Sequence, residues 1–255
     1  MADYEVEQIV ARREAVPLEV MIRRLTRRFE LSQPAIDALL GLPYTLKDFA
    51  PGQYILREGE QVQQSSFVVA GFVYRSKIVG DGGRQIVAIH LMGDFVDLQH
   101  IMLRRADHNI QALTPATLVQ FPAEQLLDLA YRYPEIGKAL WLESLIEAAT
   151  FREGVVNVGR RDARTRTAHL LCELAVRREA AGLGPRGSYE LPMSQEQIGD
   201  ALGLTSVHVN RTLKTLEAEG LIARTKRAVT VADWEGLRRA GDFTPHYLHL
   251  HQKPE

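Results

Sequence analysis

The chain has 255 residues, of which 45% are hydrophobic and 25% are charged, values that exclude wholesale disorder and favour two domains over one. Its formal net charge is −1, but residues 159–255 carry 15 lysines and arginines against 12 acidic residues, and residues 1–158 carry 16 against 20. A more basic C-terminal part suits a protein with one end that faces nucleic acid.

The single cysteine, Cys172, excludes an internal disulfide and any all-cysteine zinc or iron–sulfur site within one chain. Its place on an apolar helical face favours a small core residue over a redox sensor. The acidic start of the chain is unlike a signal peptide, and no apolar run approaches the ~18 residues of a membrane span. We therefore expect a cytoplasmic protein with no membrane partner.

The first ~45 residues are predicted to be helical, because apolar residues recur at helical spacing from Leu18 to Leu25 and Ser32 can begin a second helix. Four arginines lie between or beyond these apolar positions: Arg23, Arg24, Arg27 and Arg28. Such a run can be a nucleic-acid patch, but the solvated face of an amphipathic helix is the favoured interpretation.

From about residue 44 to residue 121, short runs rich in Val, Ile, Phe and Tyr alternate with glycines. Evenly spaced short strands with turn signals predict a rolled or closed antiparallel β structure. Asp81-Gly82-Gly83 stands between two such runs and predicts a hairpin turn.

Residues 126–161 are again predicted to be helical, with Pro134 in the first turn of a long helix. An apolar stripe based on a seven-residue repeat runs along this helix and consists of Leu142, Leu145, Ile146, Ala149 and Val156. A parallel two-stranded coiled coil requires such a repeat, so we expect the stripe to be a dimer interface. The alternative is that it packs on the β domain of its own chain. Gly159 can end the helix, and Asp162 can cap the next one.

Residues 194–220 have the spacing of a helix-turn-helix. Ser194 and Gln197 predict a capping box at the start of the first helix, and Gly203 predicts its end. Gly199, four residues before that end, lets the two helices cross closely.

The second helix is predicted over residues 206–218 and has two distinct faces. Its apolar face consists of Val209, Leu213 and Leu216, and its other face carries the candidate base contacts Ser206, Val207, Asn210 and Arg211. Arg211 can donate two hydrogen bonds to a guanine edge, which is worth roughly 1–3 kcal/mol of discrimination. The candidate phosphate contacts on this helix are its cap Thr205, His208 and Lys214.

The basic segment Thr225-Lys226-Arg227 separates two strand-like runs and predicts the β-hairpin of a winged domain. We expect Lys226 and Arg227 to contact the phosphate backbone. The alternative is a winged module that serves only for contacts with other proteins.

Four stretches resemble the Crp–Fnr (cyclic-AMP receptor protein / fumarate–nitrate regulator) family: Gly52–Glu60, Asp81–Ile86 with Gly93–Leu98, Arg166–Leu174 and Ser194–Ile222. They span most of the chain from about residue 20 to residue 240, and the last is the most specific. The resemblance implies an α+β fold with an N-terminal antiparallel β-roll domain of the cyclic-nucleotide-binding type, a long dimerisation helix and a C-terminal winged helix-turn-helix. It also implies a homodimer that binds a two-fold symmetric operator in double-stranded DNA and contacts RNA polymerase.

On this basis we expect a sensor domain with its N-terminal helices in residues 1–132, the dimerisation helix in residues 133–160, and the DNA-binding domain with a C-terminal tail in residues 161–255. The family often has a glutamate where Val207 stands. An apolar side chain cannot accept a hydrogen bond from cytosine, although it can touch a thymine methyl group, so the usual half-site is in question.

The sensor domain departs from the family's cyclic-nucleotide binders, which hold the ribose with a glycine–glutamate pair and the phosphate with an arginine followed by serine or threonine. Asp97-Leu98 and Ala106-Asp107 stand at those places, and a carboxylate repels a phosphate. A candidate effector pocket remains, made of Gly93, Asp97, Leu98, Arg104 and Arg105, in which the arginines could restore a phosphate contact. We nevertheless predict no cofactor and expect no cyclic nucleotide, and one cysteine excludes the cluster of the family's oxygen-sensing branch.

The histidines predict no metal site. His90, His100 and His108 are scattered through the β region and are expected to be structural, whereas His246, His249 and His251 lie in a tail without a carboxylate or cysteine to complete a site. No catalytic motif is present, so we expect no enzyme and no catalytic residues. Two alternatives stay open: a small-molecule-binding signalling module that acts through protein contacts with a vestigial helix-turn-helix, and a metal- or cofactor-dependent enzyme.

Overall fold

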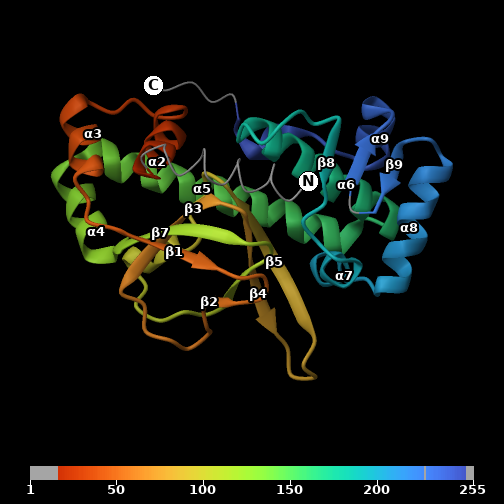
Figure 1. Cartoon of the computed structure of the whole chain (residues 1–255), viewed down its shortest axis with the longest axis horizontal. Helices are drawn as coiled ribbons and strands as arrows, with labels where there is room; N and C mark the ends of the chain where they lie inside the picture. The colour runs from red at the N-terminus through yellow and green to blue at the C-terminus, as the bar shows by residue number, and fades with distance from the viewer. Residues whose placement is uncertain (1–16, 227, 251–255) are drawn as a thin grey trace. The chain divides into compact units, whose positions relative to one another are not determined.

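The computed structural model describes residues 17–226 and 228–250. It contains two compact units, of which the first holds residues 17–75 and 89–145 and the second holds Ser76–Ala88 and Ile146–Leu250. The boundary falls within the long helix α5 (Pro134–Arg160), and Figure 1 labels the elements of both units. None of the helices in this described part is long and apolar enough to cross a membrane.

Antiparallel sheets form the centre of the first unit, as the glycine-punctuated pattern predicts. One sheet has the order β1 (Thr45–Phe49), β7 (Ala116–Pro122), β3 (Gln64–Ala70). The other has the order β2 (Tyr54–Leu56), β6 (Asn109–Ala112), β4 (Phe72–Ile78), β5 (Arg84–Leu91). Their inner side chains, among them Val68, Val73, Ile110 and Leu118, form a continuous buried cluster.

The turn between β4 and β5 is the predicted one. Gly82 has φ 85°, in the left-handed region that favours glycine, and the Asp81 carboxylate accepts a hydrogen bond from the Gly83 N–H at 2.9 Å. The end of this hairpin belongs to the second unit, where the Arg84 guanidinium donates to the Asp200 carboxylate at 2.7 Å.

Helices cover the sheet formed by β1, β7 and β3. Together with that sheet they form a second buried apolar cluster. They are α2 (Pro17–Thr26), α3 (Gln33–Leu40), α4 (Ala123–Arg132), the short 3-10 helix η1 (Leu98–Ile101) and the first turns of α5. Leu18, Met21 and Leu25 of α2 are at most 1% exposed, and Ser32 caps α3 by accepting from the Ala35 N–H. The apolar spacing and the cap therefore predict these two helices correctly.

Two arginines, Arg24 in α2 and Arg28 just after its end, differ from the predicted solvated face. Arg28 is only 6% exposed and donates to one oxygen of Glu143 in α5 at 2.9 Å. Arg24 donates to the other oxygen of Glu143 at 3.0 Å and lies 3.2 Å from Asp94. Burial is the main cause that lowers the pKa of Arg28. The prediction is wrong for these two arginines, because their common partner is 115 or more residues away.

The second unit is built around α6 (Ala163–Ala180), which Asp162 caps as predicted and which packs against α8 and α9. The remaining elements are β8 (Ser188–Glu190), α7 (Gln195–Leu202), α8 (Ser206–Ala218), β9 (Ile222–Thr225), β10 (Ala228–Val231), α9 (Trp234–Ala240) and η2 (Pro245–Leu248). Cys172 in α6 is fully buried, which raises the pKa of its thiol to about 12 and confirms its place in the core.

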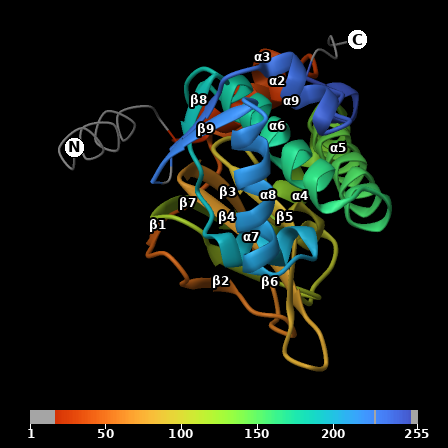
Figure 2. The same ribbon diagram turned by 90° about the vertical axis from the view of Figure 1, so that its right-hand side faces the viewer.

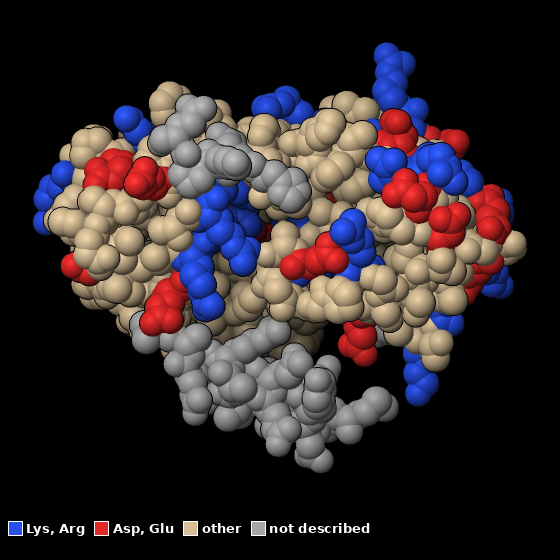
Figure 3. All heavy atoms as spheres, turned by 90° about the horizontal axis from the view of Figure 1, so that it is seen from above, with Lys and Arg blue, Asp and Glu red and all other residues tan. Residues whose placement is uncertain are grey.

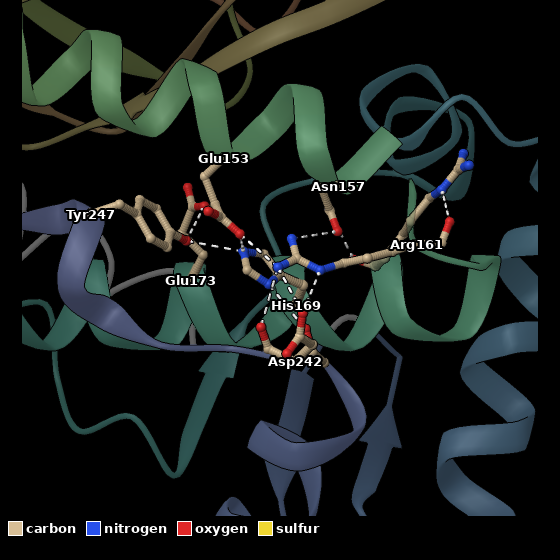
Figure 4. A network of polar contacts seen from close by, with 9 residues as sticks. Glu153, Asn157, Arg161, His169, Glu173, Asp242 and Tyr247 are labelled. Carbon is tan, nitrogen blue, oxygen red and sulfur yellow. Dashed lines mark hydrogen bonds and ion pairs between the residues drawn. The ribbon is translucent and has the colours of Figure 1, made fainter. Parts of the chain in front are cut away.

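A polar network connects α5, α6 and the segment after α9 (Figure 4). The Arg161 guanidinium lies 2.7 Å from the Glu153 carboxylate. The Tyr247 hydroxyl donates to Glu173 at 2.7 Å and lies 3.1 Å from Nε2 of His169. Arg161, the residue after α5, also lies 3.1 Å from the Asp242 carboxylate. The Tyr247 contacts therefore join the C-terminal segment to α6, and the Arg161 contact joins it to the end of α5.

The C-terminal segment is therefore less loose than the expected surface tail. Phe243 is 2% exposed and Leu248 is 3% exposed, so both belong to the core of the second unit. His246 and His249 are exposed, as expected for surface residues, and His251 lies outside the described residues.

Candidate nucleic-acid interface

Helix α7 begins at the predicted capping box. The Ser194 hydroxyl accepts from the Gln197 N–H at 3.2 Å, and the Gln197 side-chain oxygen accepts from the Ser194 N–H at 2.8 Å. Ile198 and Leu202 are buried beneath the helix. Two otherwise unpaired backbone donors are thus satisfied, which fixes where α7 starts.

The turn between α7 and α8 depends on two glycines. Gly203 ends α7 with φ 64°, a conformation that strains other residues. A Cβ atom on Gly199 would stand 2.3 Å from the carbonyl oxygen of Leu204, closer than real atoms approach. The Leu204 N–H donates to the Gly199 carbonyl at 3.0 Å. The prediction that Gly199 allows a close crossing of the helices is confirmed.

Helix α8 turns one face to the core and the other to solvent, and it lies beside α7 at the front of Figure 2. Val209, Leu213 and Leu216 are at most 1% exposed. The other face presents the four candidate base contacts: Ser206, Val207 and Arg211 are exposed, and Asn210 is half-buried. Within the described part of the chain Arg211 forms no ion pair, so its guanidinium is available to an external acceptor.

The first turn of α8 holds two of the candidate phosphate contacts. The Thr205 hydroxyl accepts from the His208 N–H at 3.3 Å and lies 3.1 Å from Nδ1 of His208. Both side chains are exposed, as is Lys214 further along the helix. The N–H groups and the positive dipole end at this helix start favour an anion.

The hairpin of β9 and β10 occupies the place of the predicted wing. Thr225 pairs with Ala228 at its end, and the exposed Lys226 in the turn has φ 55°. Arg227 lies outside the described residues. The Arg224 guanidinium lies 2.6 Å from Glu217, so an ion pair holds the wing against α8.

Basic and acidic side chains are interspersed on the face drawn in Figure 3. The coloured residues of this face form no broad basic surface, in keeping with a formal net charge of −1.

The predicted effector pocket does not form one environment. Its first three residues, Gly93, Asp97 and Leu98, are buried, whereas Arg104 and Arg105 are exposed. Arg104 lies 3.0 Å from the exposed Glu124 of α4. The arrangement thus gives no support to the idea that these arginines restore a phosphate contact.

The cation that acts on Asp97 is Arg75 of β4, a residue that the sequence analysis did not single out. Arg75 donates to the Val96 carbonyl oxygen. The Asp97 carboxylate accepts from the Ser66 N–H at 2.6 Å and from the Ser65 hydroxyl at 3.2 Å. Burial outweighs these contacts and raises the pKa of Asp97 to about 6.

Replacing Asp97 with Asn is expected to change how stability depends on pH. The pKa of Asp97 is about 6 in the folded chain against an ordinary 3.8, so the folded state binds the proton more tightly and the native chain loses stability as the pH rises from about 4 to 6. The difference in pKa corresponds to a decrease of roughly 3 kcal/mol in the free energy of unfolding. The Asn variant should not show this decrease.

Urea unfolding of both chains at pH 4 and pH 7 measures this effect as the difference between them, so that other titrating groups cancel. Parallel stability curves for the two chains would contradict the assignment of the raised pKa to Asp97.

The apolar stripe of α5 divides between the chain's own core and solvent. Ile146 and Ala149 are 6% and 7% exposed. Leu142 is half-buried, and Leu145 and Val156 are exposed. Three further large apolar residues are exposed on this helix: Trp141, Phe151 and Val155. The seven-residue repeat did not identify them, because spacing in the sequence does not show which side of a helix is covered by the rest of its own chain.

Two family models match the chain: the cyclic nucleotide-binding domain over residues 46–133 and the Crp-like helix-turn-helix domain over residues 165–240. The chain is 33% identical over 212 residues to the nitrogen fixation regulation protein FixK of Azorhizobium caulinodans, covering 82% of this chain and 84% of that protein. It is 30% identical to the transcriptional activator protein FnrL of Cereibacter sphaeroides, covering 77% and 80%. Among solved structures it is similar to FixK2 from Bradyrhizobium japonicum, with a TM-score of 0.73 and 27% identity over 80% of this chain and 100% of that one.

Proposed function

We propose that this chain, which belongs to the Crp–Fnr family of DNA-binding transcriptional regulators, acts as a homodimer that reads a two-fold symmetric operator through α8 and the β9–β10 wing. The observation that carries the proposal is the solvent-facing side of α8, where Arg211 is exposed while Val209 and Leu213 on the opposite side are buried. A helix that is fixed on one face and polar on the other suits insertion into the major groove.

The contacts divide into those that specify sequence and those that position the protein. Arg211 would donate to a guanine edge, and Val207, which is 66% exposed, would touch a thymine methyl group. Ser206 and Asn210 complete the base-reading set. The phosphate-contacting set, which carries no sequence information, consists of Thr205, His208, Lys214, Lys226 and Arg227.

The exposed apolar residues of α5 support the dimer. Trp141, Leu145 and Val155 are 67%, 51% and 55% exposed in the single chain, and burying such side chains against the same helix of a second copy is favourable. A two-fold dimer would place its two α8 helices one DNA turn apart, ~34 Å. RNA polymerase is a further partner on this proposal, as in the family.

The proposed regulator is not an enzyme and does not use a cyclic nucleotide. Asp97 accepts its two hydrogen bonds from the chain itself, and Asp107 places an exposed carboxylate where the family's nucleotide binders carry a phosphate ligand. A negative charge there opposes a phosphate.

Replacing Arg211 with Ala is expected to abolish operator selectivity while the dimer stays folded. Each arginine contributes ~1–3 kcal/mol of discrimination between base pairs, and a dimer carries two. The measurement starts from random duplex DNA, from which the native chain selects its operator with and without cell extract. The affinities of both chains for that operator and for unrelated DNA are then compared, and sedimentation gives the oligomeric state.

Lys226→Ala is the matched control, because it removes a proposed phosphate-binding side chain and leaves α8 intact. It should weaken binding to all sequences alike and reduce the salt dependence of binding, with a slope smaller by about one for each phosphate that is no longer neutralised. Unchanged selectivity in the Arg211 variant would refute the base-reading role. A native chain that retards no duplex DNA at low salt would instead favour a signalling module with a vestigial helix-turn-helix.

A further inference from the structure

Two histidines that look scattered in the sequence lie together in the first unit. His100 of η1 and His108, which precedes β6, have nearly parallel rings with centroids 5.5 Å apart. They are 1% and 4% exposed. With Asp107 they form a group of three residues that each offer one metal-binding atom, and these atoms lie within 4.8 Å of one another. The expectation that these histidines are scattered is therefore wrong for this pair.

The imidazole of His100 points to a missing partner. Both of its ring nitrogens are buried, and neither has a hydrogen-bond partner among the residues that the structure describes. Buried polar side chains are nearly always hydrogen-bonded, so an exception of this kind asks for an explanation. A bound ion that takes one nitrogen as its ligand supplies one.

The chain around the second histidine is held in place. The Gly59 N–H donates to the Ala106 carbonyl at 2.8 Å, and the Ala106 N–H donates to the Glu60 carbonyl at 3.0 Å. Nδ1 of His108 lies 2.6 Å from the Asp107 carboxylate. This contact holds the imidazole of His108 beside the Asp107 carboxylate.

We propose that His100, His108 and Asp107 bind a divalent transition-metal ion of the class to which Zn²⁺ and Fe²⁺ belong. Two imidazoles and one carboxylate are a common ligand set for both ions. Ligand atoms around one such ion lie ~3.3 Å apart, since each bond is about 2.0–2.2 Å long. The ligand atoms of the group now lie within 4.8 Å of one another, so binding an ion would draw them together by side-chain rotation. The side chain of Asp107 is 81% exposed and stands on the open side of the group.

The charges around the group act in both directions. The positive charge of Arg75 opposes a cation, but Asp97 interacts with Arg75 and offsets it. The Asp107 carboxylate adds a negative charge on the open side of the group, which favours a cation.

Metal titration of the full-length chain tests the site. After dialysis against a chelator, calorimetry with Zn²⁺ and absorption spectroscopy with Co²⁺ should both give one ion per chain, with visible Co²⁺ bands of a nitrogen- and oxygen-ligated ion. Asp107→Asn, on an exposed side chain that leaves the fold intact, should weaken the affinity at least ~10-fold. His100→Gln should weaken it further.

Two control variants locate the ion. His90→Gln changes another buried histidine of the first unit, and the double variant His246→Gln/His249→Gln changes the exposed C-terminal pair; both should bind as the native chain does. The proposal is overturned if the native chain takes up neither ion, or if Asp107→Asn binds with unchanged affinity. The second test remains valid even if the His100 variant fails to fold. The assay contains no DNA, so its result is independent of the proposed function.

Discussion

Replacing Glu143 with Ala is expected to lower the free energy of unfolding by about 3–5 kcal/mol, because it removes the carboxylate that pairs with the buried Arg28 and with Arg24. Glu143 is 7% exposed and accepts from Arg28 at 2.9 Å and from Arg24 at 3.0 Å. Arg28 is itself only 6% exposed, so water cannot take the place of the missing carboxylate. Urea unfolding at neutral pH, followed by circular dichroism, measures the loss of stability.

The exposed pair of Arg104 and Glu124 is the matched control. Its ions are also 3.0 Å apart, but the two side chains are 65% and 73% exposed. Glu124→Ala should therefore change the free energy of unfolding by at most about 1 kcal/mol. The double variant Arg28→Met/Glu143→Leu should recover most of the stability, because apolar side chains of similar volume can replace a buried ion pair. Equal effects of the two single variants would show that burial does not decide the strength of these pairs.

Features that depend on neighbouring residues could be predicted from the sequence. Ser194, Thr205 and Asp162 each cap the helix that follows them, as expected from the type of residue and its spacing. A cap needs only a side-chain oxygen and a backbone N–H two or three residues further on, so a short segment contains all the information. The faces of α8 could be predicted for the same reason, since helical periodicity alone separates Val209 from Arg211.

Features that depend on distant segments could not be predicted in this way. The ion pairs of Arg24 and Arg28 with Glu143 join segments that are more than 100 residues apart, and no local pattern distinguishes a buried arginine from a solvated one. The proximity of His100 and His108 arises because the chain turns back between η1 and β6. Both groups require knowledge of which segments the fold brings together.

Replacing Gly199 with Ala is expected to open the helix-turn-helix and to weaken DNA binding more than tenfold. The added Cβ atom would lie 2.3 Å from the Leu204 carbonyl oxygen, which belongs to the backbone and cannot rotate away. Overpacking of this kind costs about 1–3 kcal/mol, and the relief available here is a movement of α7 away from the start of α8. That movement breaks the hydrogen bond from the Leu204 N–H to the Gly199 carbonyl and changes the angle at which α8 meets DNA.

Gly154→Ala separates this steric effect from helix propensity. Gly154 also lies inside a helix, α5, but a Cβ atom there would meet nothing within 4 Å. Alanine is favoured over glycine in a helix by roughly 1 kcal/mol, so this variant should be as stable as the native chain or more stable. Urea unfolding gives the change in stability of each variant, and DNA retardation gives the affinity of the Gly199 variant. A loss of stability and of DNA binding for Gly199→Ala, with no loss of stability for Gly154→Ala, would attribute the weaker binding to the close crossing of the helices. If the Gly199 variant is as stable as the native chain and binds the operator equally well, then α7 and α8 can separate without harm and their close contact does not position α8 for DNA.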